Sequence, residues 1–252
     1  MSIAEAFHHF VTAHIVTGSV GLLTFWIPVL GRKGGKWHRR GGYIFAYALL
    51  ATGAIAILIA MCTILAPGPT HPHLLAHPDF GSAAMIRGIF GWMMLYLAVL
   101  TVNLSWYGLQ CLRHKRRHEG NKSWLNLALQ GVLTLASANC LIHGVLLGQG
   151  LMVGISFVGF ATVGTNLWFI YTPKPGPKGW LLEHIKALVG AGISVYTAFL
   201  AFGAVRILPE AALTPALWSM PLIVGLTLII YHQNQVRRGF RPKRAAINPS
   251  AE

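Results

Sequence analysis

The sequence predicts an all-α protein, a polytopic membrane bundle of seven transmembrane helices. Of the 252 residues, 54% are hydrophobic and only 10% are charged, whereas a soluble domain carries about 25% charged residues. The charged residues also fall in short clusters between long uncharged runs, as expected for connections between spans. The hydrophobic content excludes a disordered chain, and three cysteines in a chain of this length exclude a disulfide scaffold.

Each span is predicted from an uncharged run, because a helix needs about 20 apolar residues to cross a hydrocarbon core about 30 Å thick. The runs cover residues 6–31, 41–78, 88–112, 123–173, 187–205 and 211–236. The fourth run is too long for one crossing, and Gly148-Gln149-Gly150 is expected to divide it by a turn. The second run ends at Ala66-Pro67-Gly68-Pro69, where proline and glycine stop a helix. In chain order, the predicted helices are 8–30, 42–65, 83–109, 124–147, 151–172, 183–207 and 214–236.

Lysine and arginine predict the orientation, because cytoplasmic connections carry the excess of positive charge. Of the 20 Lys and Arg, all except Arg87 and Arg206 fall in or beside the first, third and fifth connections or after the last helix. We therefore expect a multi-pass protein of the bacterial inner membrane, with the N-terminus outside and the C-terminus in the cytoplasm. Residues 1–236 form one transmembrane domain, and residues 237–252 form a basic cytoplasmic tail. The net charge of +14 then faces anionic lipid, so the expected partner is the bilayer and not a nucleic acid.

Ionisable side chains inside a span are costly, so they are the first candidates for function. His14 in the first span and His143 in the fourth lie at a similar depth near the outer surface, and Arg87 begins the third span. Two histidines on different helices can ligate the iron of haem b, and an arginine can pair with a haem propionate. The alternative interpretation is that these histidines make interhelical hydrogen bonds near the lipid headgroups.

A second group of polar residues gathers near the inner surface. His38 and Arg39 lie in the first basic connection, and Glu183 and His184 open the sixth helix. Glu183 either transfers a proton or binds a ligand, or it forms an ion pair with Arg39 or Arg40. A stripe of small and polar residues follows on the sixth helix, and it indicates either close packing or a polar path. The stripe consists of Ala187, Gly190, Ser194, Thr197 and Ala201.

The outer connection between the second and third helices is rich in histidine. It contains His71, His73, His77 and Asp79 close together in the chain. Imidazole and carboxylate side chains are the ligands of zinc and copper sites, so this connection is a candidate metal site. Irregular spacing in a loop is equally typical of solvated side chains.

Two blocks of the sequence resemble a known family. The first block, residues 31–42, contains Trp37-His38-Arg39-Arg40, and the second, residues 180–200, contains Glu183-His184. Together with the first span and the leucine- and proline-rich segment 213–221, they resemble a bacterial family of seven-helix membrane proteins catalogued as a domain of unknown function. The resemblance implies the fold and the membrane location, without an established reaction. It directs attention to His14, His38, Arg39, Glu183 and His184.

Three functions are compatible with these residues. The first is a redox protein that holds haem b, or copper or zinc, through histidines and exchanges electrons with a quinone. Twelve histidines against six carboxylates favour this nitrogen-rich ligation. The second is a transporter or channel for a small solute or ion, and the third is a non-catalytic subunit or assembly factor with a membrane-protein partner. None of the usual nucleotide-binding or hydrolase motifs occurs, so the sequence assigns no enzyme class.

Overall fold

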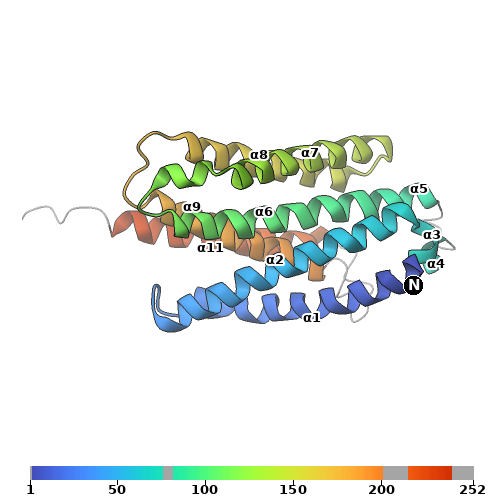
Figure 1. Cartoon of the computed structure of the whole chain (residues 1–252), viewed down its shortest axis with the longest axis horizontal. Coiled ribbons are helices and arrows are strands. Elements are labelled where there is room, and N and C mark those ends of the chain that lie inside the picture. The colour runs from blue at the N-terminus through green and yellow to red at the C-terminus, as the bar shows by residue number, and fades with distance from the viewer. Residues whose placement is uncertain (1, 76–81, 201–214, 240–252) are drawn as a thin grey trace, which may run out of the picture.

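The computed structural model describes residues 2–75, 82–200 and 215–239, which form helices joined by turns, without a strand (Figure 1). The first two long helices are α1 (Ile3–Leu30) and α2 (Lys36–Leu65). The third is a continuous rod made of α5 (Ala83–Ile86), the π-helical segment η1 (Arg87–Met93) and α6 (Met94–Arg113). The remaining long helices are α7 (Trp124–Leu146), α8 (Gly150–Tyr171), α9 (Gly179–Ala198) and α11 (Pro215–Arg238).

Each of the seven predicted segments corresponds to one long helix or rod among the described residues. The predicted end of the sixth segment, residues 201–207, lies outside the described residues. Five helices are long and apolar enough to cross a membrane: α1, α2, the rod Ala83–Arg113, α7 and α8. The all-α prediction is therefore confirmed, and these five helices suit a multi-pass membrane protein.

Proline and glycine end the helices where the sequence predicts. Gly148 has a positive φ of 64°, a conformation that suits glycine, between α7 and α8. Across this turn the Gln149 amide donates to the Gly144 carbonyl at 2.8 Å. Helix α2 stops at Leu65, directly before Ala66-Pro67, and two short helices, α3 (Pro67–Thr70) and α4 (Pro72–Leu75), follow.

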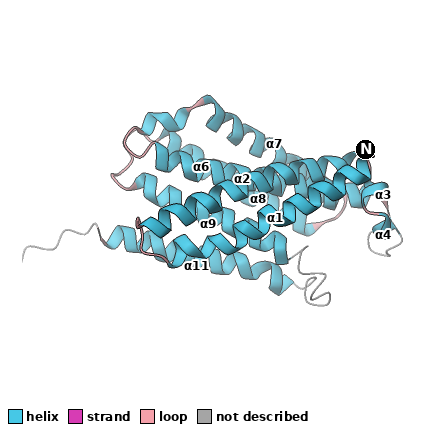
Figure 2. Cartoon of the chain, turned by 60° about the horizontal axis from the view of Figure 1, so that its bottom comes forward, coloured by secondary structure: helices cyan, strands magenta, loops and turns pink. Residues whose placement is uncertain are grey.

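Helix α6 lies at the centre of the bundle. Helices α2, α7 and α9 pack on it, while α1 packs on α2, α8 on α7 and α11 on α9. Figure 1 shows α1 along one edge and α7 and α8 along the opposite edge, with α2 and α6 between them. Figure 2, a view turned by 60°, shows α9 and α11 running beside each other. The α6 side chains Tyr96 and Tyr107 are only 1% and 0% exposed, so this central helix is covered from several sides.

The connections between helices gather at two ends of the bundle. The basic end carries the connections 31–35, 114–123 and 172–178, and it includes the 3-10 helix η2 (His118–Lys122). The opposite end carries the N-terminus and the connections 66–75 and 147–149 (Figure 1). Hydrophobic side chains cover the sides between these ends. Leu23, Leu30, Leu135 and Trp168 are between 72% and 81% exposed, which suits contact with lipid and not with water.

Candidate functional site

A little-exposed ion pair occupies the basic end. The Glu183 carboxylate on α9 accepts a hydrogen bond from the Tyr107 hydroxyl on α6 at 2.8 Å. The same carboxylate pairs with the Lys186 ammonium, which lies 2.5 Å away and one turn further along α9. Lys186 also donates to the Thr165 hydroxyl on α8 at 3.1 Å. The side chains of Glu183 and Lys186 are 16% and 23% exposed, so three helices hold this charge pair largely away from solvent.

Lys186 replaces the partner that the sequence predicts for Glu183. The ion-pair alternative assigns Glu183 to Arg39 or Arg40, whereas Glu183 pairs with Lys186, and Arg39 is exposed in the structure. Residues three apart on one helix face each other, so Lys186 reaches the carboxylate without leaving α9. The three-residue spacing of Glu183 and Lys186 is the feature of the sequence from which this ion pair could be predicted. Tyr107 offered no comparable signal, because its contact depends on the packing of α6 against α9.

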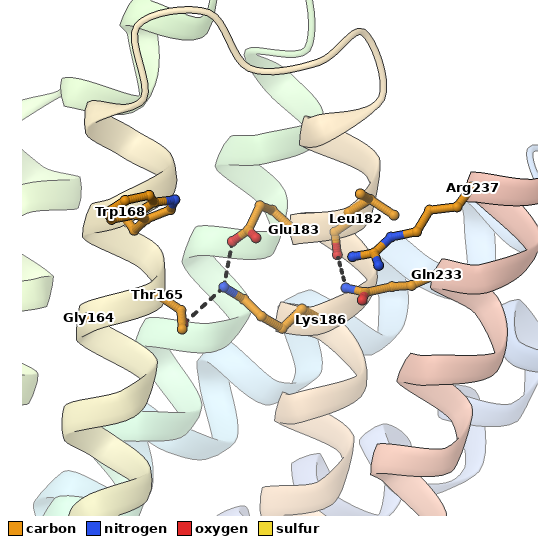
Figure 3. A pocket seen from close by; sticks show the side chains of 8 residues that line it. All are labelled: Gly164, Thr165, Trp168, Leu182, Glu183, Lys186, Gln233 and Arg237. Atoms are coloured by element: carbon orange, nitrogen blue, oxygen red, sulfur yellow. Dashed lines mark hydrogen bonds and ion pairs between the residues drawn. The ribbon is translucent and has the colours of Figure 1, made fainter. Parts of the chain in front are cut away.

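A hollow of about 490 Å³ lies beside the ion pair. Figure 3 shows its lining side chains on α8, α9 and α11, with Glu183 and Lys186 between Thr165 and Gln233. The Gln233 side-chain amide donates to the Leu182 carbonyl at 3.1 Å and so joins α11 to α9. The Glu183 carboxylate therefore lies at the wall of this hollow. Its polar lining includes Thr165, Glu183, Lys186, Gln233 and Arg237.

Two predicted histidines hold helices together beside this site. His184 Nδ1 donates to the Gly108 carbonyl of α6 at 3.0 Å, and His38 Nδ1 donates to the Pro28 carbonyl of α1 at 3.0 Å. His38 lies close enough to His184 and to His232 of α11 to interact with both electrostatically. The structure therefore brings the predicted His38 and His184 to one end of the bundle. Within the described ranges, no group of three His, Cys, Asp or Glu is arranged to hold a metal ion.

His14 and His143 contact different parts of the bundle, and haem b ligation by this pair stays a prediction. His14 Nδ1 donates to the Thr52 carbonyl of α2 at 3.2 Å. The His143 ring stacks on Trp92 of η1, with ring centroids 5.3 Å apart. Two axial ligands must both reach one iron, whereas α2 and α6 lie between α1 and α7 (Figure 1). His14 instead makes the interhelical hydrogen bond that the alternative interpretation expects.

Arg87 and the stripe on α9 also make packing contacts. Arg87 Nε donates to the Ile64 carbonyl of α2 at 3.0 Å. Arg87, the predicted partner of a haem propionate, therefore joins η1 to α2. The Ser194 hydroxyl of the stripe shares a hydrogen bond with the Thr101 hydroxyl of α6 at 2.7 Å. Ala187, Gly190 and Ser194 of the stripe therefore lie against α6, and its last member, Ala201, lies outside the described residues.

The predicted zinc or copper site is described only in part. Two of its four predicted ligands lie outside the described residues, namely His77 and Asp79. The His71 ring packs against Phe7 of α1 and Phe90 of η1, with centroids 5.1 Å from each. Burial, and secondarily the charge of His73, lowers the pKa of His71 from 6.5 to about 4. The His71 ring is therefore neutral, and it holds the connection that follows α2 against α1 and η1.

A polar cluster that sequence reasoning missed lies between α6, α7 and α8. Asn103, Gln130 and Asn166 are 0%, 2% and 0% exposed. The Asn166 amide nitrogen donates to Asn103 Oδ1 at 3.4 Å and to Gln130 Oε1 at 3.2 Å. Burying an amide side chain costs free energy unless it is hydrogen-bonded. This buried layer of three amides therefore calls for an explanation. The sequence shows these amides only as isolated polar residues within uncharged runs, and that they meet depends on how the three helices pack.

Comparisons of the chain with models of protein families, with curated proteins and with solved structures found no match. The family resemblance of the two sequence blocks stays an expectation, and any assignment of function depends on the geometry of the sites described above.

Proposed function

We propose that the protein is a seven-span ion transporter of the bacterial inner membrane that carries protons. Glu183 is the group that takes up and releases the proton at the basic end. The observation that supports this proposal is the Glu183 carboxylate, which is held by Tyr107 and Lys186 beside the hollow at that end.

The proposed topology adds α9 and α11 to the five helices that are long and apolar enough to cross a membrane. Both helices pack within the same bundle, α9 on α6 and α11 on α9, which supports a common set of spans. The basic connections share one end, as the excess of positive charge on the cytoplasmic side requires. The basic end is therefore the proposed cytoplasmic end, and the N-terminus is proposed to lie outside.

Proton exchange at Glu183 has a defined consequence for its neighbours. The Tyr107 hydroxyl and the Lys186 ammonium both stabilise the charged carboxylate. When Glu183 takes up a proton, Lys186 loses its counter-charge and keeps the Thr165 hydroxyl of α8 as a partner. Each proton therefore changes the charge beside the hollow and weakens a contact on α9, which a transport cycle requires.

The redox interpretation has weaker geometric support, because His14 and His143 contact different helices on separate sides of α6. An absorption spectrum of the purified protein checks it directly. A Soret band that disappears in both His14→Ala and His143→Ala would restore haem ligation by this pair.

Proton flux in liposomes tests the proposal. The purified chain is reconstituted with the pH-sensitive dye pyranine inside the vesicles, and an external pH step is applied. Wild-type protein should accelerate proton uptake, and Glu183→Gln should reduce the rate by about tenfold or more, because the amide cannot exchange the proton. Flux that is unchanged in correctly folded Glu183→Gln would remove Glu183 from the mechanism.

Glu119→Gln is the matched control. Glu119 also pairs with a lysine three residues later, Lys122, at 2.8 Å, but its side chain is 72% exposed. The two substitutions therefore remove the same type of ion pair, one beside the hollow and one at the surface. Equal flux in wild type and Glu119→Gln is expected, and an equal loss in both variants would point to a general charge effect.

A further inference from the structure

Most of the buried polar side-chain atoms without a partner among the described residues lie along α6, η2, α7 and α8. They are Asn103 Nδ2, Trp106 Nε1, His118 Nε2, Asn121 Oδ1, Asn126 Oδ1, Gln130 Nε2 and Asn166 Oδ1. Two further atoms of this kind belong to Ser105 and His232. At 100° per residue, Ser105 faces away from Asn103 on α6, and His232 lies on α11. The unpartnered atoms are thus concentrated in one part of the molecule.

Five of these residues form a connected line from the basic end into the bundle: Asn121, Asn126, Gln130, Asn166 and Asn103. On α7, Asn126 and Gln130 lie one turn apart on the same face, and both are buried. Asn126 donates through Nδ2 to the Asn121 carbonyl of η2 at 2.7 Å, which joins this face to the turn at the basic end. At the other end of the line, Asn166 bonds to Asn103 and Gln130 and closes a layer across three helices.

The free groups include both donors and acceptors. Asn103, Trp106 and Gln130 present N–H groups, whereas Asn126 and Asn166 present oxygen atoms. All five side chains are uncharged, so their ligand is a small neutral molecule that both donates and accepts hydrogen bonds. Water is the smallest such molecule, and a buried water typically binds about three polar partners.

We propose that α6, α7 and α8 enclose a water-filled inlet that begins at η2 and ends at the layer of Asn103, Gln130 and Asn166. The inlet holds water through the unpartnered amides and provides a second route for protons from the basic end into the bundle. The water binding is independent of Glu183, and the proton route rests on the proposed function.

The inlet ends at the amide layer because the next layer outward is closed. Gly159 of α8 has no side chain, and Ser137 of α7 and Tyr96 of α6 fill the space directly beside it. The Tyr96 hydroxyl donates to the Ile155 carbonyl at 2.6 Å, which fixes the ring in this position. Leu133, which is 0% exposed, lies on α7 between Gln130 and Ser137 and adds an apolar barrier.

Thiol accessibility tests the inlet without any transport assay. Asn126→Cys and Asn166→Cys are prepared separately in the full-length chain and exposed in membranes to Ag⁺, which travels through water and not through lipid. Both new thiols should react about tenfold or more faster than native Cys140, as measured for each site by mass spectrometry. Cys140 is 0% exposed and lies on α7 beyond the closed layer. Every sample therefore contains a control thiol that water in the inlet should not reach.

Rates as slow as that of Cys140 at both new thiols would overturn the inlet. The wild-type chain provides a measurement that does not depend on the folding of a variant. The buried indole N–H of Trp106 should show magnetisation transfer from water in an NMR experiment, and absence of this signal also overturns the proposal. If neither new thiol reacts quickly but proton flux still depends on Glu183, only this inference is contradicted. Reactive thiols in a chain without proton flux contradict only the proposed function and the proton route.

Discussion

Tyr107 joins the central helix α6 to the carboxylate of Glu183, whereas Tyr96 on the same helix donates to a backbone carbonyl. Both rings are almost fully buried, so the two hydroxyls differ mainly in the charge of their acceptors. Hydrogen bonds to charged groups contribute more to stability than those between neutral groups. The two tyrosines therefore form a matched pair for measuring how strongly the site is held.

Tyr107→Phe should lower the free energy of unfolding by about 1.5–3 kcal/mol, and Tyr96→Phe by about 0.5–1.5 kcal/mol. The reason is that only Tyr107→Phe removes a donor from a carboxylate. Denaturation in a mild detergent, followed by circular dichroism, measures both values. Equal losses would indicate that the Glu183 contact adds nothing beyond an ordinary hydrogen bond.

Acid should loosen the docking of His71 onto Phe7 and Phe90. The pKa of His71 is about 4 in the folded chain, against 6.5 ordinarily, because of burial and the charge of His73. Between these values the folded state binds fewer protons than the unfolded state, so the stabilisation is present above about pH 6.5 and is lost as the pH falls toward about 4.

Amide hydrogen exchange in residues 71–75, corrected for the intrinsic effect of pH, measures this loosening. Protection should fall as the pH is lowered in the wild type, because protonated His71 is disfavoured between the two aromatic rings. The variant His71→Phe keeps an aromatic ring but has no proton to gain, so its protection should not follow this pH dependence. The same response in both chains would exclude His71 as the titrating group.

At the scale of single residues, the sequence predicted part of the site. Glu183, His38 and His184 could be identified because ionisable groups at the end of an apolar helix are unusual. The separation of His14 from His143 could not be predicted, since depth along a helix says nothing about which helices are neighbours. Asn103 and Asn166 were missed for the same reason, because amides on separate helices acquire meaning only when they meet.

At the scale of helices, the uncharged runs predicted each long helix among the described residues. The predicted starts at residues 83 and 124 agree with the structure, whereas other helices begin earlier than predicted. Helix α2 begins at Lys36 and not at residue 42, and α9 begins at Gly179 and not at residue 183. Both extensions add basic or aromatic residues, whose long side chains can reach headgroups while the backbone stays helical. Hydrophobicity therefore marks only the apolar part of each of these helices, and the helix itself continues further.

Gly159 of α8 allows close approach of α6 and α7. A methyl group at this position would collide with Ser137 and with Tyr96, so Gly159→Ala should destabilise the bundle by about 1–3 kcal/mol. Gly164→Ala on the same helix is the control, because a methyl group there meets no atom within 4 Å. That variant should be neutral or slightly more stable, since alanine favours helix. Thermal unfolding in detergent compares the two, and equal effects would contradict the packing argument.

At the scale of the whole molecule, the fold class followed from composition, and the arrangement around α6 did not. Low charge content suits a protein in a bilayer, and a helix satisfies its own backbone hydrogen bonds there. The order of packing depends instead on small residues that meet across helices, such as Gly108 of α6 against Leu188 of α9. Such complementarity involves two distant parts of the chain, and a single sequence does not reveal it.

Reporter insertions test the proposed topology of the whole chain. Alkaline phosphatase inserted at Gly148 should be active, because the turn between α7 and α8 is proposed to lie outside. The same reporter inserted at Gly120, in η2 at the basic end, should be inactive, while green fluorescent protein at that position should fluoresce. The reverse pattern would invert the orientation and place the Glu183 hollow at the periplasmic surface.

The ion pair of Glu183 and Lys186 lies within a single helix, and this has a consequence for biogenesis. Each charge would oppose the partition of α9 from the translocon into lipid if it were alone. Because the two side chains are one turn apart, they can neutralise each other as soon as the helix forms. In the proposed topology, α9 therefore enters the bilayer with its two charges paired, whereas a helix carrying Glu183 or Lys186 alone would bring a net charge into lipid.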